Sequence, residues 1–343
     1  MPLLIREYGL SKPPREMKQS YWRLVARQFR KKKMAMVSLV VLVLLGLIAA
    51  GAPFIAEEKP IYMVADGKTY WFPNVFDYDD LLYFRFDLWE PGEGDRAIMP
   101  IVPYPPQRTN LRARLSAPDA DHWLGTDDTG RDVLSRIIWG TRVSMSIGFI
   151  SVGISIVVGV TIGAAAGYYR GWVDSAAQRI IEVILCFPAL ILILSVRVFL
   201  PPHIFYVMLV LGLTRWPVIA RLVRGEFLKL RDSDFAMAAR ASGYGDGRII
   251  FKHLLPNAMA PVLVSATFGV AGAILIESAL SFLGFGVAPP TASWGELLSQ
   301  AKRYIEQAWW LVVYPGAMIF IAVTAFNLVG EGLRDAMDPR LRQ

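Results

Sequence analysis

Few side chains in this sequence have the types and spacing that catalysis or metal binding requires. Asp127, Asp128 and Asp132 cluster in the string HWLGTDDTGRDVLSR, residues 122–136, but they do not follow the spacing of a calcium-binding EF-hand loop, and no glutamate closes the loop at the required distance. The chain also lacks a GxxxxGKS/T phosphate loop, an HExxH zinc motif and a paired CxxC. We therefore expect no catalytic, metal-binding or cofactor-binding residues, and an enzyme is the class that the sequence supports least.

The composition is that of a polytopic membrane protein. Hydrophobic residues make up 54% of the chain and charged residues 19%, and the mean hydropathy of +0.40 is too high for an ordinary soluble protein of 343 residues. The net charge of +7 is explained better by Lys and Arg on cytoplasmic loops facing anionic lipid than by binding to nucleic acid. The single cysteine, Cys186, excludes an intrachain disulfide.

Apolar runs of bilayer length predict an all-α polytopic fold with six transmembrane helices. The runs are 34–56, 142–169, 180–200, 203–224, 258–279 and 311–329. Phe187-Pro188 should kink the third helix. Gly159, Gly163 and Gly167 recur every four residues in the second, and this small-residue face either packs within the subunit, which we favour, or forms a dimer seam.

The positive-inside rule orients these helices and divides the chain. An RKKK run places the N-terminus in the cytoplasm, so 1–33 is a basic amphipathic segment that we expect to lie along the membrane surface. Segment 57–142 is then outside, and its aromatic content predicts a small folded cap. The transmembrane core, 143–330, contains a basic cytoplasmic loop, 225–256, and the tail 331–343 is again cytoplasmic. The lipid bilayer is thus the first expected partner.

Ionisable side chains inside the spans are candidates for a transport pathway. Arg215 interrupts the fourth span, where it either lines a cavity or pairs with Glu182, so a structural and a pore-lining role both stay open. Glu277, near the outer end of the fifth span, is the third candidate. The histidines fall in an outer loop, at a span end and in the inner loop, and so cannot meet at one metal site; they are His122, His203 and His253.

The stretch 232–257, DSDFAMAARASGYGDGRIIFKHLLPN, is polar and basic between two long apolar runs. Its alanines and its Asp-Ser-Asp start predict one short helix, which Gly243, Gly245 and Gly247 then break. A second amphipathic turn follows until Pro256. Two short helices around a glycine hinge suit a docking element. A DNA-binding helix-turn-helix motif has the same arrangement of helices, but the bilayer-length spans on both sides disfavour it. We therefore expect no nucleic-acid partner.

This stretch resembles the EAA loop through which the membrane subunit of an ABC importer binds its ATPase. The matching residues are Ala238, Ala239, Gly243, Leu255 and Pro256. Met237 stands where the family usually has a glutamate that pairs with a basic residue of the ATPase, and Asp232 or Asp234 is the candidate substitute. The resemblance implies ATPase coupling through Asp234, Met237, Ala238, Ala239, Gly243, His253, Leu255 and Pro256.

A longer match lies just before the second span. The string LGTD-x-x-GRDVLSR is similar to the signature of C-type permease subunits of dipeptide and oligopeptide ABC importers, and its residues here are Gly125, Thr126, Asp127, Gly130, Arg131 and Asp132. The string that begins at Glu277, E-x-A-L-S-F-L-G, matches the same subunits. The resemblance covers 122–340 strongly and 20–56 weakly. It implies the type I ABC importer permease fold, with the extracytoplasmic cap inserted between helices 1 and 2.

The resemblance also implies a function and partners. The chain is expected to be a membrane-spanning subunit of a peptide importer in a prokaryotic plasma membrane, with both termini cytoplasmic. It would work with a homologous B-type permease, two ABC ATPases that bind ATP and magnesium, and an extracytoplasmic substrate-binding protein. The alternative is an ATPase-independent secondary transporter or channel that uses the intramembrane charges, which six spans without an evident internal repeat disfavour.

Overall fold

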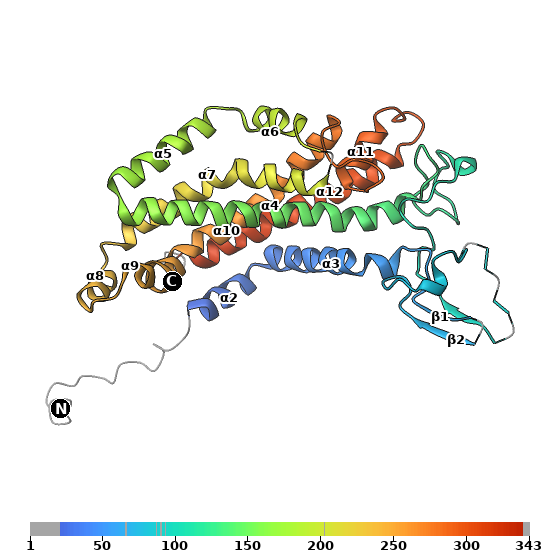
Figure 1. The fold of residues 1–343 in the computed structure, drawn as a ribbon, viewed down its shortest axis with the longest axis horizontal. Helices are drawn as coiled ribbons and strands as arrows, with labels where there is room; N and C mark the ends of the chain where they lie inside the picture. The colour runs from blue at the N-terminus through green and yellow to red at the C-terminus, as the bar shows by residue number, and fades with distance from the viewer. Residues whose placement is uncertain are drawn as a thin grey trace, which may run out of the picture.

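The computed structural model describes residues 21–65, 67–86, 88–89, 91–92, 94–201 and 203–338. Two predicted cytoplasmic segments therefore lie partly outside the described residues, namely 1–20 of the basic segment and 339–343 of the tail. Figure 1 shows an elongated bundle of helices with a small β-sheet unit at one end and short helices at the other.

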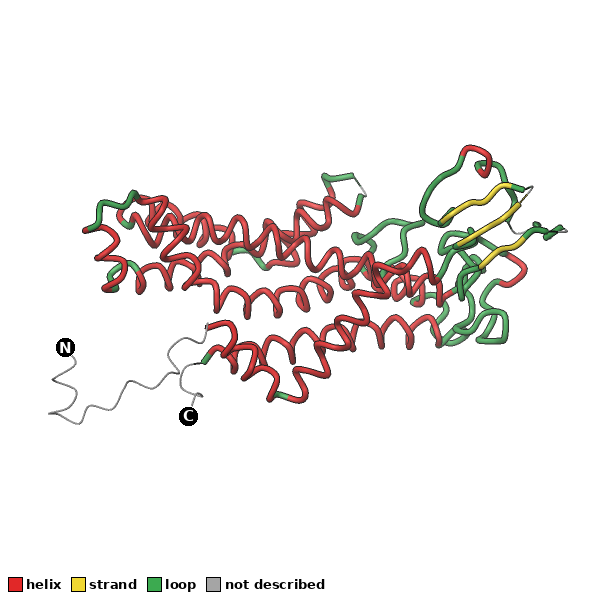
Figure 2. The backbone as a smooth tube through the Cα atoms, turned by 90° about the horizontal axis from the view of Figure 1, so that it is seen from below, coloured by secondary structure: helices red, strands yellow, loops and turns green. Residues whose placement is uncertain are grey.

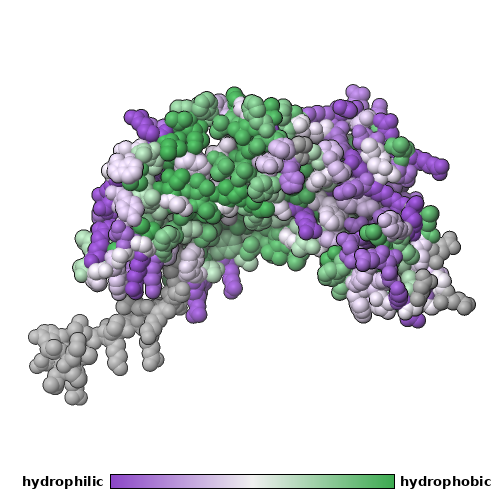
Figure 3. Space-filling view, in the orientation of Figure 1, coloured by the Kyte–Doolittle hydropathy of each residue, from purple (hydrophilic) through white to green (hydrophobic). Residues whose placement is uncertain are grey.

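Within the described residues, five helices are long and apolar enough to cross a membrane. They are α3 (Lys33–Ile55), α4 (Val133–Tyr169), α7 (Ile204–Leu230), α10 (Leu255–Phe282) and α12 (Trp310–Met337). Apolar side chains, green in Figure 3, cover the middle of the bundle, and hydrophilic side chains, purple, gather at its two ends. This is the distribution expected of a helical bundle in a bilayer, where side chains in the middle contact hydrocarbon and side chains at the two ends contact water and headgroups.

A sixth crossing is made by two shorter helices, α5 (Gly171–Leu185) and α6 (Ala189–Val198), which meet at an angle of 84°. Pro188 lies at the break, where it has no N–H group to continue the hydrogen-bond ladder of α5. The sequence predicts a kink at this place, and the break is confirmed there, although it is far sharper than a kink and its first arm begins at Gly171. With the bent pair as one crossing, the predicted all-α fold with six spans is confirmed.

Close packing of α4 against α7 forms the centre of the bundle. A Cβ atom added at Gly163 would lie 2.4 Å from the carbonyl oxygen of Ala220, and one at Gly167 would lie 2.6 Å from the Cβ of Phe227. Gly159 approaches the same helix as closely. The small-residue face is therefore buried inside the subunit, as favoured from the sequence, and is not available as a dimer seam.

Gly163→Ala is expected to destabilise the chain by about 1–3 kcal/mol, because the added methyl group would press on backbone atoms that cannot move away. Gly153→Ala on the same helix is the matched control, since a Cβ atom there meets nothing within 4 Å. That control should be neutral or stabilising, because alanine is favoured over glycine in a helix by about 1 kcal/mol. Thermal unfolding in detergent checks both, and equal midpoints would contradict the packing.

The segment between α3 and α4 folds as a cap, residues 56–132. Its antiparallel sheet has the order β2-β1-β3, with β1 (Tyr62–Ala65), β2 (Lys68–Trp71) and β3 (Arg96–Ile98). Its described residues also form 3-10 turns at Asp79–Leu81, between β2 and β3, and at Leu111–Ala113, after β3. Figure 2 shows the strands, in yellow, beyond the ends of the helices. The sheet covers a small core of Met63, Tyr70 and Leu81. Because α4 begins at Val133, residues 133–142 of the predicted outer segment are helical.

Short helices mark the two ends of the bundle. α11 (Trp294–Ala301) lies at the cap end, whereas α2 (Tyr21–Lys31), α8 (Asp234–Ala241) and α9 (Asp246–Arg248) lie at the opposite end (Figure 1). α2 packs along the end of α12, and Lys32, which lies between α2 and α3, pairs with Asp335 of α12, with 2.7 Å between Nζ and Oδ2. A π-helical turn, Ile249–Leu254, connects α9 to α10.

Candidate functional site

The predicted docking stretch is an exposed pair of short helices between α7 and α10. α8 ends before Gly243, which has a φ of +75°, a left-handed conformation that glycine adopts without strain. Ala236 and Ala239 are buried on one side of α8, and Met237 on the other side is 51% exposed. The exposed residues form what we call the α8 surface: Asp234, Phe235, Met237, Ala238 and Tyr244.

The buried side of the stretch is fixed to the membrane-spanning helices. Tyr168, at the end of α4, donates its hydroxyl hydrogen to Asp246 Oδ1 at 2.6 Å. The guanidinium carbons of Arg231 and Arg240 lie 5.8 and 5.7 Å from the centre of the same ring, and Arg240 donates to the Arg231 carbonyl. A shared apolar cluster includes Ala236, Ala239, Val223, Phe227, Ile249 and Leu254. The α8 surface must therefore move together with the ends of α4, α7 and α10.

The three predicted coupling residues beyond the glycine hinge lie where the π-helical turn meets α10. The rings of His253 and Tyr244 stack with centres 5.8 Å apart and planes 8° apart, and Arg248 lies 4.1 Å from the Tyr244 ring centre. Leu255 is half-buried, and Pro256 is exposed in the first helical turn, where a missing N–H group costs nothing. His253 thus positions an exposed aromatic side chain of the α8 surface.

The two aspartates that could replace the carboxylate missing at Met237 differ in their surroundings. Asp232 Oδ2 lies 2.7 Å from a guanidinium nitrogen of Arg170, so this carboxylate is already paired. Asp234, in the first turn of α8, is exposed and has no ion pair among the described residues. Of the two carboxylates, Asp234 is therefore the one without an ion pair among the described residues.

The three charged candidates for the pathway do not meet. Glu182 forms an exposed ion pair with Arg179 on its own helix, at 3.2 Å. Arg215 lies against α10, where a Cβ atom at Gly272 would be 2.5 Å from its Nη1, and it has no ion pair within the described ranges. The alternative in which Arg215 pairs with Glu182 is therefore wrong. A pathway-lining role for Arg215 stays a prediction.

Glu277 is fully buried near the end of α10. Its Oε1 accepts hydrogen bonds from Ser281 Oγ and Ser293 Oγ, both at 2.8 Å, whereas its Oε2 has no hydrogen-bond partner. Ser293 is the N-cap residue of α11, so the carboxyl group fastens α11 to α10. In this conformation Glu277 closes a turn between two helices and does not face an open path.

The outer signature forms a buried turn before α4, with Asp127 at its centre. Asp127 Oδ1 accepts from the backbone N–H groups of Thr129 and Arg131, at 2.8 and 3.0 Å, and its Oδ2 accepts from Arg131 Nε at 2.6 Å. Burial raises the pKa of Asp127, but the nearby Arg136 cation and these donors outweigh burial and hold the pKa below its ordinary value. The motif is therefore built around an ionised, internally paired carboxylate.

The other signature residues shape this turn and attach it to the helices. Gly125 and Gly130 have φ values of +76° and +75°, and a Cβ atom at Gly130 would lie 1.8 Å from a carbonyl oxygen of the cap. Asp132 caps α4, accepting a backbone N–H of its first turn at 2.7 Å. Trp310 Nε1 donates to the Thr126 carbonyl at 3.0 Å. The signature thus joins the cap to α4 and α12.

Two residues that the sequence predictions missed extend this network. Arg136 on α4 donates to Glu296 Oε2 on α11 at 2.5 Å, and its Nε lies 3.5 Å from Asp127 Oδ2. All three side chains are buried. Burial raises the pKa of Glu296, although the Arg136 cation opposes this. Arg136 is the last residue of the quoted signature string, but nothing in the sequence indicates that Glu296 is its partner.

Arg197 is a second buried charge whose role the sequence does not reveal. Its guanidinium group donates to four carbonyl oxygens, those of Phe285 at 3.2 Å, Leu200 at 2.9 Å, Pro201 at 2.7 Å and Gly286 at 3.4 Å. It therefore joins the end of α6 to the turn that follows α10, and it does so through the backbone and without a carboxylate.

Arg197→Met should destabilise the chain by about 1–3 kcal/mol, because it leaves buried carbonyl groups without donors. Arg197→Lys is the matched control. Lysine keeps the charge, but its single ammonium group lacks the forked donors that reach the carbonyl groups after α6 and those after α10 at the same time. We expect the lysine variant to unfold between the wild type and the methionine variant in a thermal unfolding measurement. A methionine variant as stable as the wild type would show that these hydrogen bonds do not stabilise the attachment of α6 to the turn that follows α10.

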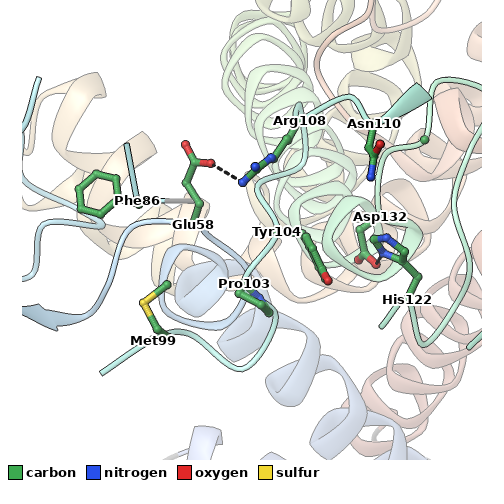
Figure 4. A pocket seen from close by; sticks show the side chains of 10 residues that line it. Glu58, Phe86, Met99, Pro103, Tyr104, Arg108, Asn110, His122 and Asp132 are labelled. Carbon is green, nitrogen blue, oxygen red and sulfur yellow. Dashed lines mark hydrogen bonds and ion pairs between the residues drawn. The ribbon is translucent and has the colours of Figure 1, made fainter. Parts of the chain in front are cut away.

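A cavity of about 310 Å³ lies between the cap and the signature turn (Figure 4). On one side the rings of Tyr104 and His122 lie with centres 4.6 Å apart and planes tilted by 37°, and His122 Nδ1 lies 2.9 Å from Asp132 Oδ2. Figure 4 shows the Arg108–Glu58 ion pair, 3.3 Å long, on the other side. Burial raises the pKa of Asp132 although its hydrogen bonds oppose this. The described residues hold no group of three metal-ligating side chains.

Comparison with known families and proteins gives consistent matches. The model of the family described as "Binding-protein-dependent transport system inner membrane component" matches residues 159–343, and that described as "N-terminal TM domain of oligopeptide transport permease C" matches residues 20–71. The chain is 35% identical to the dipeptide transport system permease protein DppC of Alkalihalophilus pseudofirmus, over 99% of this chain and 97% of the relative. It is 43% identical to a Brucella suis protein provisionally named a peptide transport system permease protein, over 69% of this chain and 80% of the relative.

Among solved structures, the chain is similar to one of the MetNI methionine ABC transporter in an inward-facing conformation. The sequence identity is 20% and the TM-score is 0.48, and the match covers 59% of this chain and 97% of that chain.

Proposed function

The chain belongs to the family of binding-protein-dependent transport system inner membrane components, and from this premise we propose that it couples peptide translocation to ATP hydrolysis by partner subunits. It is a multi-pass protein of the inner membrane and a member of the peptide and dipeptide ABC importer permeases. Together with a homologous B-type permease it would form the translocation path. Two ABC ATPases would bind ATP and magnesium, and a substrate-binding protein would deliver the peptide.

The observation that carries this proposal is the α8 surface. It is exposed, it lies between two membrane-spanning helices, and its buried side is fixed to α4, α7 and α10. An ATPase that holds Asp234, Met237 and Ala238 would therefore pull on the whole bundle and not on a loose loop. Closure of the ATPases could then rock the helices between inward-open and outward-open states. Docking of the ATPases would place the α8 end of the bundle in the cytoplasm. In that orientation both termini would be cytoplasmic and the cap would be outside.

A secondary transporter would need charged groups that can share an ion or a proton within the spans. Glu182 is paired with Arg179, Arg215 lies against Gly272 and Glu277 is enclosed by two serines. These side chains offer no common site, so the arrangement favours the ATP-driven importer.

Purification of the tagged chain in mild detergent, with mass spectrometry and an ATPase assay of the eluate, tests the proposal. We expect a second permease and ATPases that carry phosphate-binding loops, with hydrolysis stimulated by the binding protein and a peptide. A solitary chain that carries a dipeptide into liposomes along an ion gradient, without ATP, would establish the secondary transporter instead.

A further inference from the structure

The cap carries a row of exposed apolar side chains on the edge nearest to α3. This cap edge is residues 71–76, and its exposed members are Trp71, Phe72, Val75 and Phe76. Trp71 is 60% exposed and Phe76 is 59% exposed. Large apolar side chains gathered on one small surface mark a contact with another protein or with a membrane, whereas the same residues scattered singly would not.

The cap edge is attached to the last turn of a membrane-spanning helix. Asn74 Nδ2 donates to the carbonyl oxygen of Pro53 at 2.9 Å, where the helix end leaves that carbonyl without a backbone donor. The ring of Phe72 meets that of Phe54 edge to face, with centres 5.9 Å apart. Phe54 belongs to the last turn of α3 and is itself exposed. The cap edge therefore lies beside the last turn of α3.

The backbone of the cap edge directs the apolar side chains outward. Phe72 has a φ of +55°, an unfavourable conformation for a bulky residue, and its N–H group donates to the Ile61 carbonyl at 2.9 Å. The N–H groups of Val75 and Phe76 both donate to the Phe72 carbonyl at 2.9 Å, so the chain makes a tight turn. Pro73 is buried in that turn, whereas Phe72, Val75 and Phe76 remain exposed. A turn fixed in this way keeps apolar side chains out of the core of the cap.

The position of the cap beside the bundle identifies what covers this edge. In Figure 1 the sheet projects past the end of α3 to the side on which no other helix covers α3, and Figure 3 shows the resulting overhang. Four of the 23 residues of α3 are buried, as expected for a helix that packs along one side and faces lipid on the other. Because Phe54 belongs to the last turn of this membrane-spanning helix, we place the membrane surface at its level. Aromatic side chains are favoured at this level, where the ring is buried among headgroups and acyl chains.

We propose that the cap edge inserts into the headgroup region of the leaflet at the cap end of α3, and so anchors the cap to the lipid surface. The apolar row Trp71, Phe72, Val75 and Phe76 would continue the lipid-facing surface of α3 outward from Phe54. The anchor fixes the tilt of the cap relative to the bilayer. It requires only that α3 spans the membrane and does not depend on ATPase coupling.

Site-specific fluorescence in lipid nanodiscs tests the proposal on the full-length chain in the complex in which it is purified. The single cysteine, Cys186, is first replaced by alanine, and an environment-sensitive label is attached at Phe76→Cys. The matched control is Thr69→Cys, on the same sheet but farther from α3 along β2, and exposed. The nanodiscs contain phosphatidylcholine brominated near the headgroup end of its acyl chains, and aqueous iodide serves as the second quencher.

We expect brominated lipid to quench the label at position 76 and iodide to leave it bright, with the reverse result at position 69. Strong quenching by iodide at position 76 would show that water covers the cap edge and would overturn the proposal. Protection from both quenchers would overturn it as well, because a protein partner would then cover the edge. Val75→Cys repeats the measurement with a smaller change of side chain, and unfolding midpoints confirm that each labelled chain is folded.

Discussion

Replacing Met237 by arginine is expected to lower uptake of a labelled dipeptide by roughly ten-fold or more, because an unpaired charge at the centre of a desolvated interface costs about 2 kcal/mol or more. Met237 is half exposed on the α8 surface. The resemblance to the EAA loop implies that a glutamate at this position would pair with a basic residue of the ATPase. An arginine at position 237 would place a second positive charge next to that basic residue of the ATPase. Met237→Glu would instead form the ion pair with it and should keep or raise uptake.

Two further variants separate lost coupling from lost folding. Ala239→Leu, two positions along the chain, places a larger side chain in the buried cluster and should lower the unfolding midpoint by overpacking. Thr69→Arg adds the same charge to an exposed site on the cap and should change neither uptake nor stability. ATPase activity in proteoliposomes, uptake and thermal unfolding are measured for each. Normal uptake by Met237→Arg would contradict docking through the α8 surface.

Local patterns in the sequence predicted most of the architecture. Apolar runs of bilayer length identified the membrane-spanning helices, the Phe187-Pro188 pair identified the break in the third, and glycines spaced by four identified the face of α4 that packs on α7. The family resemblance was confirmed over nearly the whole chain. These signals are local, since each depends on residues within a few turns of one another, and a sequence displays them directly.

Contacts between distant residues could not be predicted in this way. Arg136 and Glu296 are 160 positions apart, and the carbonyl groups that bind Arg197 belong partly to a turn that follows another helix. The sequence offered Glu182 as a partner for Arg215 because both lie in spans, but nothing near either residue shows which neighbours the two side chains face. Within the EAA triplet, the sequence also could not show that Ala238 is exposed and Ala239 buried.

Arg136→Met is expected to cause the largest loss of stability, about 3–5 kcal/mol, because it leaves the buried Glu296 carboxylate without its cation. Arg136 is fully buried, donates to Glu296 Oε2 at 2.5 Å and lies 3.5 Å from Asp127 Oδ2. Asp127 keeps Arg131 and two backbone donors in the variant, so Glu296 is the group left uncompensated. The double variant Arg136→Met/Glu296→Gln removes that charge and should recover part of the lost stability.

The pH dependence of the single variant distinguishes an unpaired charge from a simple packing defect. Burial already raises the pKa of Glu296 in the native chain, and loss of the Arg136 cation raises it further. A folded carboxyl group with a raised pKa binds its proton before the unfolded chain does, so the stability of Arg136→Met should increase as the pH falls from neutral into the mildly acidic range. The double variant has no carboxyl group at 296 and should lack this increase. A methionine variant whose unfolding midpoint follows the same pH profile as the double variant would show that lost packing, and not the unpaired charge of Glu296, destabilises it.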